Sequence, residues 1–215
     1  MAEFPDQADV VIVGIGGIVG SSVAHHLIER GWSNIVGLDK SAVPTDIGST
    51  AHASDFCFTT GPDLFTTYTT RYSQDFYEAR GNYVRKGGLE VARVDDDGRM
   101  LELKRKVGQG KAYGTDVALL SPAQAKLKFP FLDETMIQGA MWDPDAGLVV
   151  PRSQTVAGDL VEEAVATGKL SVFPYTPAIR VVVENGKVVG VETRRGVIKT
   201  ERVVLSVGIW GAPLA

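Results

Sequence analysis

The residues best suited to chemistry lie in a glycine cluster and at an acid downstream of it. An apolar run over residues 10–13 leads into Gly14, Gly16, Gly17 and Gly20, and a second apolar run ends at Asp39. Glycines let the chain turn sharply and let backbone N–H groups approach a pyrophosphate. A carboxylate after the second strand can accept hydrogen bonds from both hydroxyls of an adenosine ribose and would repel a 2′-phosphate. This order of strand, glycine turn, helix, strand and acid is typical of a dinucleotide-binding βαβ unit.

The spacing of these glycines departs from the usual fingerprint. The fingerprint is G-x-G-x-x-G, whereas this sequence reads G-x-G-G-x-x-G and is one residue longer. We expect the turn to take up the extra residue, because Asp39 stands 19 residues after Gly20, close to the spacing of about 20. The alternative is a βαβ unit whose glycines serve only close packing.

A long loop after Asp39 holds the other candidate residues. Residues 40–63 show no regular pattern, and a long loop in a compact domain is usually functional or disordered. Gly48, Ser49, Thr50 and His52 stand within five residues of one another, and small hydroxyl side chains beside a glycine suit a phosphate or a cofactor edge. From the residues alone, His52 is equally a cofactor residue or a surface histidine. The adjacent histidines at 25 and 26 are interpreted as structural or solvent-facing.

The elements that must position these residues follow from hydrophobic periodicity and turn signals. We expect helices at about 18–30, 63–80, 95–110 and 153–167, and another that begins at Ser121-Pro122. Strands are expected at 10–13, 35–38, 86–94, 171–173 and 202–207, and a strand with turns at Asp143-Pro144 and Ala146-Gly147 is expected over 139–150. An antiparallel meander over 179–199 is expected to turn at Asn185-Gly186.

Three helix faces predict what is buried. Val19, Val23 and Leu27 share one face of the first helix, and Val156, Leu160 and Ala164 share one face of the last. An aromatic stripe at four-residue spacing is more typical of core than of a substrate site; its members are Leu64, Tyr68, Tyr72 and Phe76.

Composition excludes several classes of protein. The chain has 215 residues, 44% of them hydrophobic, and a formal net charge of −4, which argues against a nucleic-acid partner. One cysteine, Cys57, allows neither an internal disulfide nor a multi-cysteine metal site, and we expect no metal. No run is long enough to span a membrane. The N-terminal residues resemble neither a signal peptide nor a transit sequence, so we expect a cytoplasmic protein rather than one of the mitochondrial matrix. The last strand ends close to residue 215, so we expect an N-terminal piece of a longer protein.

Taken together, the motifs resemble a known family. The chain is similar to the D-amino-acid-oxidase-type superfamily of flavin amine oxidoreductases, and within it to the dimethylglycine and sarcosine dehydrogenase/oxidase group. The similarity runs through DVVIVGIGGIVGSSVA, RGWSNIVGLDK, GSTAHA, GGLEVA, LKRKVG, LLSPAQA, DPDAGL, GKVVGVET and VVLSVGIWGA. It implies FAD rather than NAD, and an α/β fold with α+β inserts. We expect a Rossmann-like FAD-binding domain of parallel sheet and antiparallel β-meander in residues 1–60 with 151–215. Part of a substrate or cap domain, with its own sheet, is expected in residues 61–150.

The resemblance also assigns site residues by position. Alongside the four glycines, Ile18 and Val19 would lie against the pyrophosphate. Asp39 would hold the ribose with Lys40 beside it. Ser49, Thr50 and Ala51 would line the cofactor loop, and His52 matches the histidine to which the family links FAD covalently. Phe56, Ala178 and Gly208 complete the expected cofactor set. The residues that hold the substrate are expected beyond Ala215, so no catalytic residue is assigned here.

The activity implied is oxidation of a CH–NH bond in an N-methylated amino acid such as dimethylglycine or sarcosine. A hydride would pass from the N-methyl carbon to the flavin, and the resulting iminium would be hydrolysed to formaldehyde or captured by folate. The electron acceptor would be oxygen or a flavoprotein. Two alternatives remain. One is a non-catalytic regulatory or scaffold subunit with a flavin fold. The other is an NAD-dependent dehydrogenase, against which the loop after Asp39 is too long and no regular βα repeat follows.

Overall fold

The computed structural model describes residues 3–212 and divides the chain into two units. The first unit comprises Met1–Ser54 and Pro151–Ala215, and the second comprises Asp55–Val150. The functional roles expected for residues 1–60 with 151–215 and for residues 61–150 stay a prediction.

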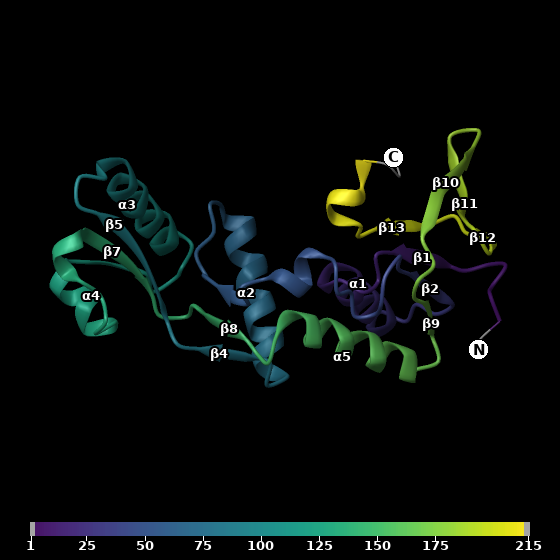
Figure 1. Ribbon diagram of the computed structural model, residues 1–215, viewed down its shortest axis with the longest axis horizontal. Coiled ribbons are helices and arrows are strands. Elements are labelled where there is room, and N and C mark those ends of the chain that lie inside the picture. Colours follow the sequence, from purple (N-terminus) through teal and green to yellow (C-terminus); the bar gives the residue numbers. More distant parts are fainter. Residues whose placement is uncertain (1–2, 213–215) are drawn as a thin grey trace. The chain divides into compact units, whose positions relative to one another are not determined.

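A four-stranded parallel sheet forms the centre of the first unit (Figure 1). Its strands stand in the order β13 (Val203–Leu205), β1 (Val10–Val13), β2 (Ile35–Leu38) and β9 (Leu170–Phe173). Every residue of β1 and β2 is buried, because both faces of the sheet are covered, which is why these strands read as continuous apolar runs. The expected parallel sheet is confirmed.

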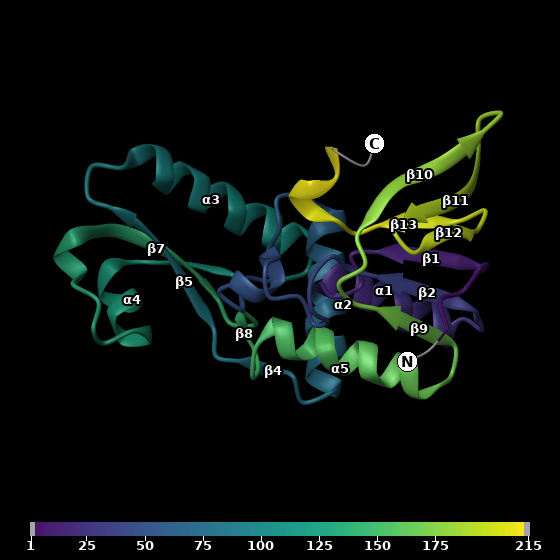
Figure 2. The same cartoon turned by 45° about the vertical axis from the view of Figure 1, so that its right-hand side comes forward.

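Alternate residues of β1 face two different hydrophobic clusters. Val10 and Ile12 pack with residues of α1 (Ile18–Glu29) and α5 (Ser153–Ala166). Val11 and Val13 pack with Val191 and Ile198 of the meander on the other face. The meander consists of β10 (Ala178–Glu184), β11 (Lys187–Thr193) and β12 (Gly196–Lys199), paired antiparallel. The first unit therefore has three layers, helices, parallel sheet and meander (Figure 2).

Local sequence explains the meander's first turn and the end of α1. Asn185 and Gly186 both have positive φ, at 51° and 75°, as a tight hairpin turn of right-handed twist requires. Gly31 has a φ of 88° and follows α1. The predicted meander, its turn and both helices are confirmed. Val156, Leu160 and Ala164 are buried as predicted, whereas Val19 is 62% exposed.

The second unit holds two antiparallel sheets. One has the order β5 (Gly88–Arg93), β7 (Ile137–Asp143), β6 (Ala118–Leu120), and it packs between α3 (Asp97–Ala112) and α4 (Pro122–Lys128) (Figure 1). The other has the order β3 (Phe56–Cys57), β8 (Gly147–Val149), β4 (Tyr83–Arg85). The second unit also contains α2 (Leu64–Ala79) and a short 3-10 helix, η2 (Glu134–Met136). Two further 3-10 helices, η1 (Ser49–His52) and η3 (Gly208–Trp210), belong to the first unit. The predicted start of a helix at Ser121-Pro122 is confirmed, and Ser121, the N-cap of α4, forms a reciprocal capping box with Gln124.

One expectation about the second unit was wrong and two were confirmed. The stripe expected in the core is exposed: Leu64 is 59%, Tyr68 66% and Tyr72 50% exposed. The expected strand 86–94 is confirmed as β5, which begins two residues later because Gly87 has a φ of 77°. The expected strand with turns over 139–150 is confirmed as β7 and β8, which are separated by residues 144–146.

Polar contacts explain why α2 buries its other face. Gln74 and Thr67 are buried, and the Gln74 amide donates to the Tyr83 hydroxyl at 2.9 Å. Periodicity correctly identified the residues of α2 that share a face. The face of α2 that packs inward is the opposite one, whose polar side chains have hydrogen-bond partners.

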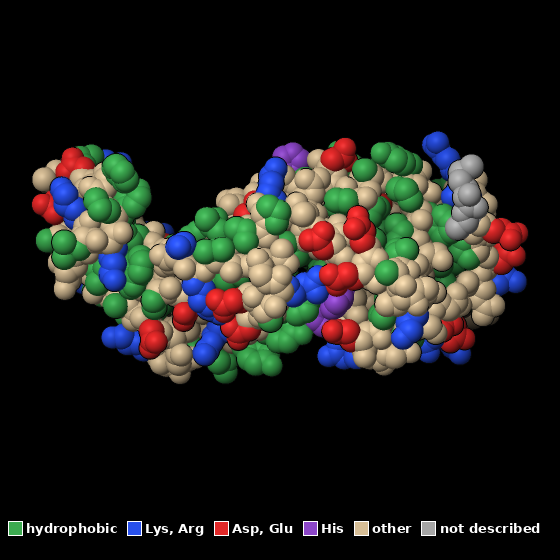
Figure 3. Space-filling view, turned by 90° about the horizontal axis from the view of Figure 1, so that it is seen from below, with side chains coloured by type: hydrophobic (Ala, Val, Ile, Leu, Met, Phe, Trp, Pro, Cys, Tyr) green, Lys and Arg blue, Asp and Glu red, His purple; other side chains and the backbone are tan. Residues whose placement is uncertain are grey.

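Charges of both signs are mixed on the face drawn in Figure 3. Among residues 3–212, no helix has the length and apolar character needed to cross a bilayer.

Candidate functional site: a dinucleotide cavity

The glycine turn, one residue longer than the usual fingerprint, connects β1 to α1. Gly14 has a φ of 88°, and the N–H groups of Gly14 and Ile15 both donate to the Leu38 carbonyl, at 2.8 and 3.1 Å. The Ile15 side chain is fully buried and packs against Gly37. These two hydrogen bonds and the buried Ile15 side chain hold residues Gly14–Gly17 in place, and α1 begins at Ile18.

Two glycines in this turn have different steric roles. A Cβ on Gly20 would lie 2.3 Å from the Gly14 carbonyl oxygen, so only glycine lets α1 pack this closely on the turn. A Cβ on Gly17 would meet only Thr50 Oγ1, at 3.5 Å. Gly17 therefore opens toward free space at the N-terminus of α1, where N–H groups and the helix dipole favour an anion.

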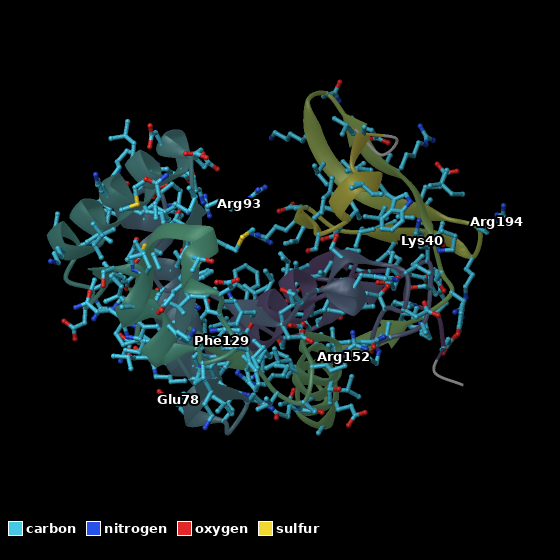
Figure 4. The ribbon with its side chains drawn as sticks, turned by 60° about the vertical axis from the view of Figure 1, so that its left-hand side comes forward. Lys40, Glu78, Arg93, Phe129, Arg152 and Arg194 are labelled. Atoms are coloured by element: carbon cyan, nitrogen blue, oxygen red, sulfur yellow. The ribbon has the colours of Figure 1, made fainter. Side chains whose placement is uncertain are left out.

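The loop that carries His52 is fixed to both helices of the first unit. The N–H of Ile18 donates to Thr50 Oγ1 at 3.0 Å, so Thr50 caps α1, whose own N-cap residue Gly17 has no side chain. Arg152, labelled in Figure 4, donates from Nη2 to the Ala51 carbonyl at 3.0 Å. These contacts place η1 beside the open end of α1.

A cavity of about 530 Å³ lies at the carboxyl ends of β1, β2 and β13. This is the position at which open α/β sheets bind ligands. Ten of the fifteen predicted site residues line it: Gly14, Gly17, Ile18, Val19, Asp39, Lys40, Ser49, Thr50, Ala178 and Gly208. Segments far apart in the sequence therefore meet at one site within the first unit.

The other five predicted residues do not line this cavity. Gly16 is buried in the turn and Gly20 in α1, and Ala51 and His52 lie on η1 next to residues that do line it. Phe56 belongs to the second unit, where its ring meets Phe58 edge-on at 5.0 Å between centroids.

The geometry of His52 determines which ring nitrogen is reactive. Its side chain is exposed, and Nδ1 lies 3.0 Å from the Gly48 carbonyl oxygen. A carbonyl oxygen can only accept, so Nδ1 carries the proton of the neutral ring. The lone pair is then on Nε2, which is the nitrogen available to a nearby electrophile.

Sequence reasoning missed half of the cavity wall. The wall residues outside the predicted cofactor set are Val13, Thr45, Ile47, Gly48, Pro177, Ile179, Leu205, Ser206, Val207 and Trp210, of which Gly48 alone was noted as a loop candidate. Five of the ten adjoin a predicted residue in sequence, which was the available signal: Val13, Gly48, Pro177, Ile179 and Val207. Trp210 had none, and its ring lies 3.4 Å from the Lys40 ammonium (Lys40 is labelled in Figure 4), a cation–π contact between the segments after β2 and β13.

A second, smaller cavity of about 250 Å³ in the second unit adjoins Cys57 and Tyr83. Burial raises the pKa of the Cys57 thiol, with Asp55 adding to the effect. Burial also raises the pKa of Tyr83 to about 12. Both groups are therefore protonated at neutral pH, and this cavity offers no activated nucleophile.

The fold and the main cavity define a dinucleotide-binding protein of the Rossmann type. The model of the FAD dependent oxidoreductase family (DAO) matches residues 9–215, and the chain belongs to that family. FAD is accordingly its cofactor, and the expectation of FAD rather than NAD is confirmed.

Proteins with different roles are similar to this chain in sequence. It is 31% identical to the mitochondrial pyruvate dehydrogenase phosphatase regulatory subunit of Mus musculus, covering 98% of this chain and 24% of the relative. It is 29% identical to mitochondrial sarcosine dehydrogenase of Homo sapiens, covering 97% and 23%. The chain thus spans about a quarter of the length of these curated relatives. The crystal structure of L-proline dehydrogenase from P. horikoshii superposes with a TM-score of 0.85 at 26% identity, covering 98% of this chain and 55% of that one.

The residues present fit FAD. The N-terminus of α1 beside Gly17 suits its pyrophosphate, and apolar side chains such as Ile47, Ile179 and Leu205 on the wall suit a ring system. The Ser206 hydroxyl oxygen is buried without a hydrogen-bond partner among residues 3–212, and a ligand in the cavity that Ser206 lines can satisfy it.

Proposed function

We propose that this chain forms the FAD-binding part of an oxidoreductase that acts on the CH–NH bond of N-methylated amino acids of the dimethylglycine or sarcosine type. The observation that carries the proposal is the placement of η1, with His52, beside the cavity and the N-terminus of α1. The relationship to sarcosine dehydrogenase supports the substrate class.

The chain's own residues bind and orient the cofactor. N–H groups at the start of α1 hold the pyrophosphate, and Thr50 keeps η1 against the same helix end through its contact with Ile18. The apolar wall excludes water from the rings, and Lys40 with Trp210 closes one side of the cavity. When bound, FAD supplies the acceptor for the hydride that leaves the N-methyl carbon.

His52 is the proposed site of a covalent link to the cofactor. The Gly48 carbonyl holds the proton on Nδ1 and leaves Nε2 as the nucleophile on an exposed ring. The link is therefore expected at Nε2. It would prevent loss of the cofactor and raise its reduction potential.

The roles of the two units and the surroundings of the protein are parts of the same proposal. The first unit is the FAD-binding domain, and the second belongs to the substrate side. The partners are a small amine substrate and, as electron acceptor, oxygen or a flavoprotein. A cytoplasmic location is the last part of the proposal.

A regulatory flavoprotein is the second candidate function. The relationship to a phosphatase regulatory subunit at 31% identity favours it. An exposed histidine on the cofactor loop argues for the enzyme, since a scaffold does not require a covalently held flavin.

Anaerobic reduction of the bound flavin separates these candidates. The native full-length protein, with any residues that follow Ala215, is loaded with FAD and mixed with sarcosine or dimethylglycine, and glycine serves as the control that lacks the N-methyl group. We expect the yellow flavin absorbance to fade with the methylated substrates and to persist with glycine. Flavin that stays oxidised with all three amines would favour the regulatory role.

A further inference from the structure

Arg152 occupies a position where helices normally have a different kind of residue. It is the N-cap of α5, with extended backbone at a φ of −162°, and its side chain makes no capping hydrogen bond to that helix. Ser, Thr, Asp and Asn are the preferred N-caps, because their side-chain oxygens accept from the first free N–H groups. The positive end of the helix dipole also disfavours a cation at this end. Arginine is therefore unfavourable for α5 itself on both counts.

The guanidinium of Arg152 contacts the cofactor loop instead (Arg152 is labelled in Figure 4). Its Nη2 donates to the Ala51 carbonyl at 3.0 Å, across 101 positions of sequence. The chain leaves the first unit after Ser54 and re-enters it at Pro151, so this contact joins the returning segment to the departing one. A residue that breaks a local rule while it makes a long-range contact is typical of a functional position.

α5 supports the same loop at a second point. Gln154 Nε2 donates to the Thr45 carbonyl at 2.8 Å. Gly158 lies four residues further along the same face of the helix, and a Cβ there would lie 3.2 Å from Pro44 Cγ. The N-terminal half of α5 therefore holds the cofactor loop both near its middle and at η1.

The Ala51 carbonyl belongs to the peptide group that leads to His52. A peptide group is planar, so a hydrogen bond that holds the Ala51 oxygen also fixes the plane in which the His52 Cα lies. The His52 ring is held separately, because Nδ1 lies 3.0 Å from the Gly48 carbonyl oxygen. Backbone and ring of His52 are thus each restrained by a hydrogen bond, and Nε2 keeps a limited range of positions.

We propose that Arg152 is a positioning residue for the covalent link to FAD, because its contact with Ala51 limits the orientations of His52. This inference rests on the proposed function, which puts the link at His52 Nε2. Overall, a C–Nε2 bond replaces one C–H bond of a flavin methyl group, and the methyl carbon and the imidazole each release a proton. Two electrons and these two protons pass to dioxygen, which becomes hydrogen peroxide. Arg152 acts through His52 and takes no part in these bond changes.

The rate of linking tests this role. Full-length protein made in riboflavin-starved cells is mixed with FAD in air, and samples are denatured with acid, washed and assayed for retained flavin. Arg152→Ser should link about threefold to tenfold more slowly than the wild-type protein, the worth of one hydrogen bond. Arg152→Lys keeps a cationic donor and should retain most of the rate. The matched control is Arg194→Ser, at an exposed arginine between β11 and β12 that Figure 4 labels, and it should link at the wild-type rate.

Stability and affinity separate positioning from a general loss of structure. Arg152→Ser gives α5 a favourable N-cap, so the Tm of the ligand-free protein should stay level or rise while linking slows. Affinity is compared in a His52→Ala background, where no link can form, and Arg152→Ser should change the Kd for FAD by less than about twofold. Linking of Arg152→Ser at the wild-type rate would overturn the proposal, and so would a Kd that rises as far as the rate falls.

The two proposals fail in different ways. If the wild-type protein binds FAD but retains none after washing, the covalent link in the proposed function is wrong. Amide hydrogen exchange of the ligand-free protein then still decides what Arg152 does. Arg152→Ser should exchange faster than the wild-type protein at residues 49–52 and no faster within α5. Equal exchange at residues 49–52 would show that Arg152 does not hold η1, and the inference would be wrong.

Discussion

At the scale of single residues, the Ser206 hydroxyl is a buried polar group beside the cavity that the sequence did not predict. Ser206 follows β13 and lines the cavity, yet its buried oxygen has no hydrogen-bond partner among residues 3–212. Such a group destabilises the ligand-free protein, by about 1–3 kcal/mol at full desolvation. Rotation about its Cα–Cβ bond breaks no hydrogen bond, so the hydroxyl can turn to a ligand freely.

Ser206→Ala should therefore change stability and affinity in opposite directions. Without ligand, the free energy of unfolding should stay level or rise by about 1 kcal/mol, because an unpaired polar group is removed. The affinity for FAD should fall by about threefold to tenfold, the worth of one hydrogen bond. Chemical denaturation and FAD titration measure the two quantities.

Ser21→Ala is the matched control for this prediction. The Ser21 hydroxyl is buried and donates to the Ile18 carbonyl at 3.1 Å, so its loss should lower stability and leave FAD affinity nearly unchanged. If Ser206→Ala is destabilised like the control and binds FAD normally, Ser206 is structural and the account of its hydroxyl is wrong.

A site residue could be predicted when its position is determined by neighbouring residues in the sequence, and was missed when it is determined by contacts between distant segments. Gly14, Gly17 and Asp39 were found because the turn between β1 and β2 is encoded in one short stretch. Ser206 and Trp210 were missed because their position depends on β13 pairing with β1, where Val203 meets Val11 from the other end of the chain.

At the scale of elements, the close packing of α1 on the glycine turn positions the whole site. Gly20→Ala would place a methyl group 2.3 Å from the Gly14 carbonyl oxygen. We expect α1 to shift, stability to fall by about 1–3 kcal/mol as in overpacked cores, and FAD binding to weaken. Chemical denaturation and FAD titration measure both effects.

Gly108→Ala provides the opposite case on another helix. Gly108 is exposed within α3, and an added Cβ would meet no described atom within 4 Å. Alanine should stabilise the second unit by about 0.5–1 kcal/mol and leave FAD binding unchanged. Equal stability for Gly20→Ala and the wild-type protein would show that the helix and turn are not packed as described.

Sequence periodicity predicted the elements better than their buried faces. The βαβ unit, α5 and the meander are confirmed because apolar spacing, caps and turn residues agree there. α2 was placed correctly but its aromatic stripe was assigned to the core wrongly. Its buried face carries Gln74, whose amide is satisfied by Thr59 and Tyr83, and a hydropathy pattern cannot identify a polar face that is satisfied by distant residues.

At the scale of the whole molecule, the cavity is built entirely within the first unit. Residues from both of its segments, 1–54 and 151–215, line it. Membership of the family identifies the cofactor as FAD, and the proposal of a covalent link rests on the position of His52 on η1. The central claim is that this unit holds FAD in the cavity at the carboxyl ends of β1, β2 and β13.

The most direct test is an absorbance spectrum of the purified protein incubated with FAD and dialysed, taken before and after acid denaturation and washing. We predict a yellow native protein with one FAD per chain, and colour that stays with the washed precipitate because His52 Nε2 holds the flavin. His52→Ala should bind FAD but lose its colour on washing, while His26→Ala, on α1, should retain it. Colour that washes out of the wild-type protein would contradict the tether alone. A native protein without any flavin absorbance would contradict the central claim.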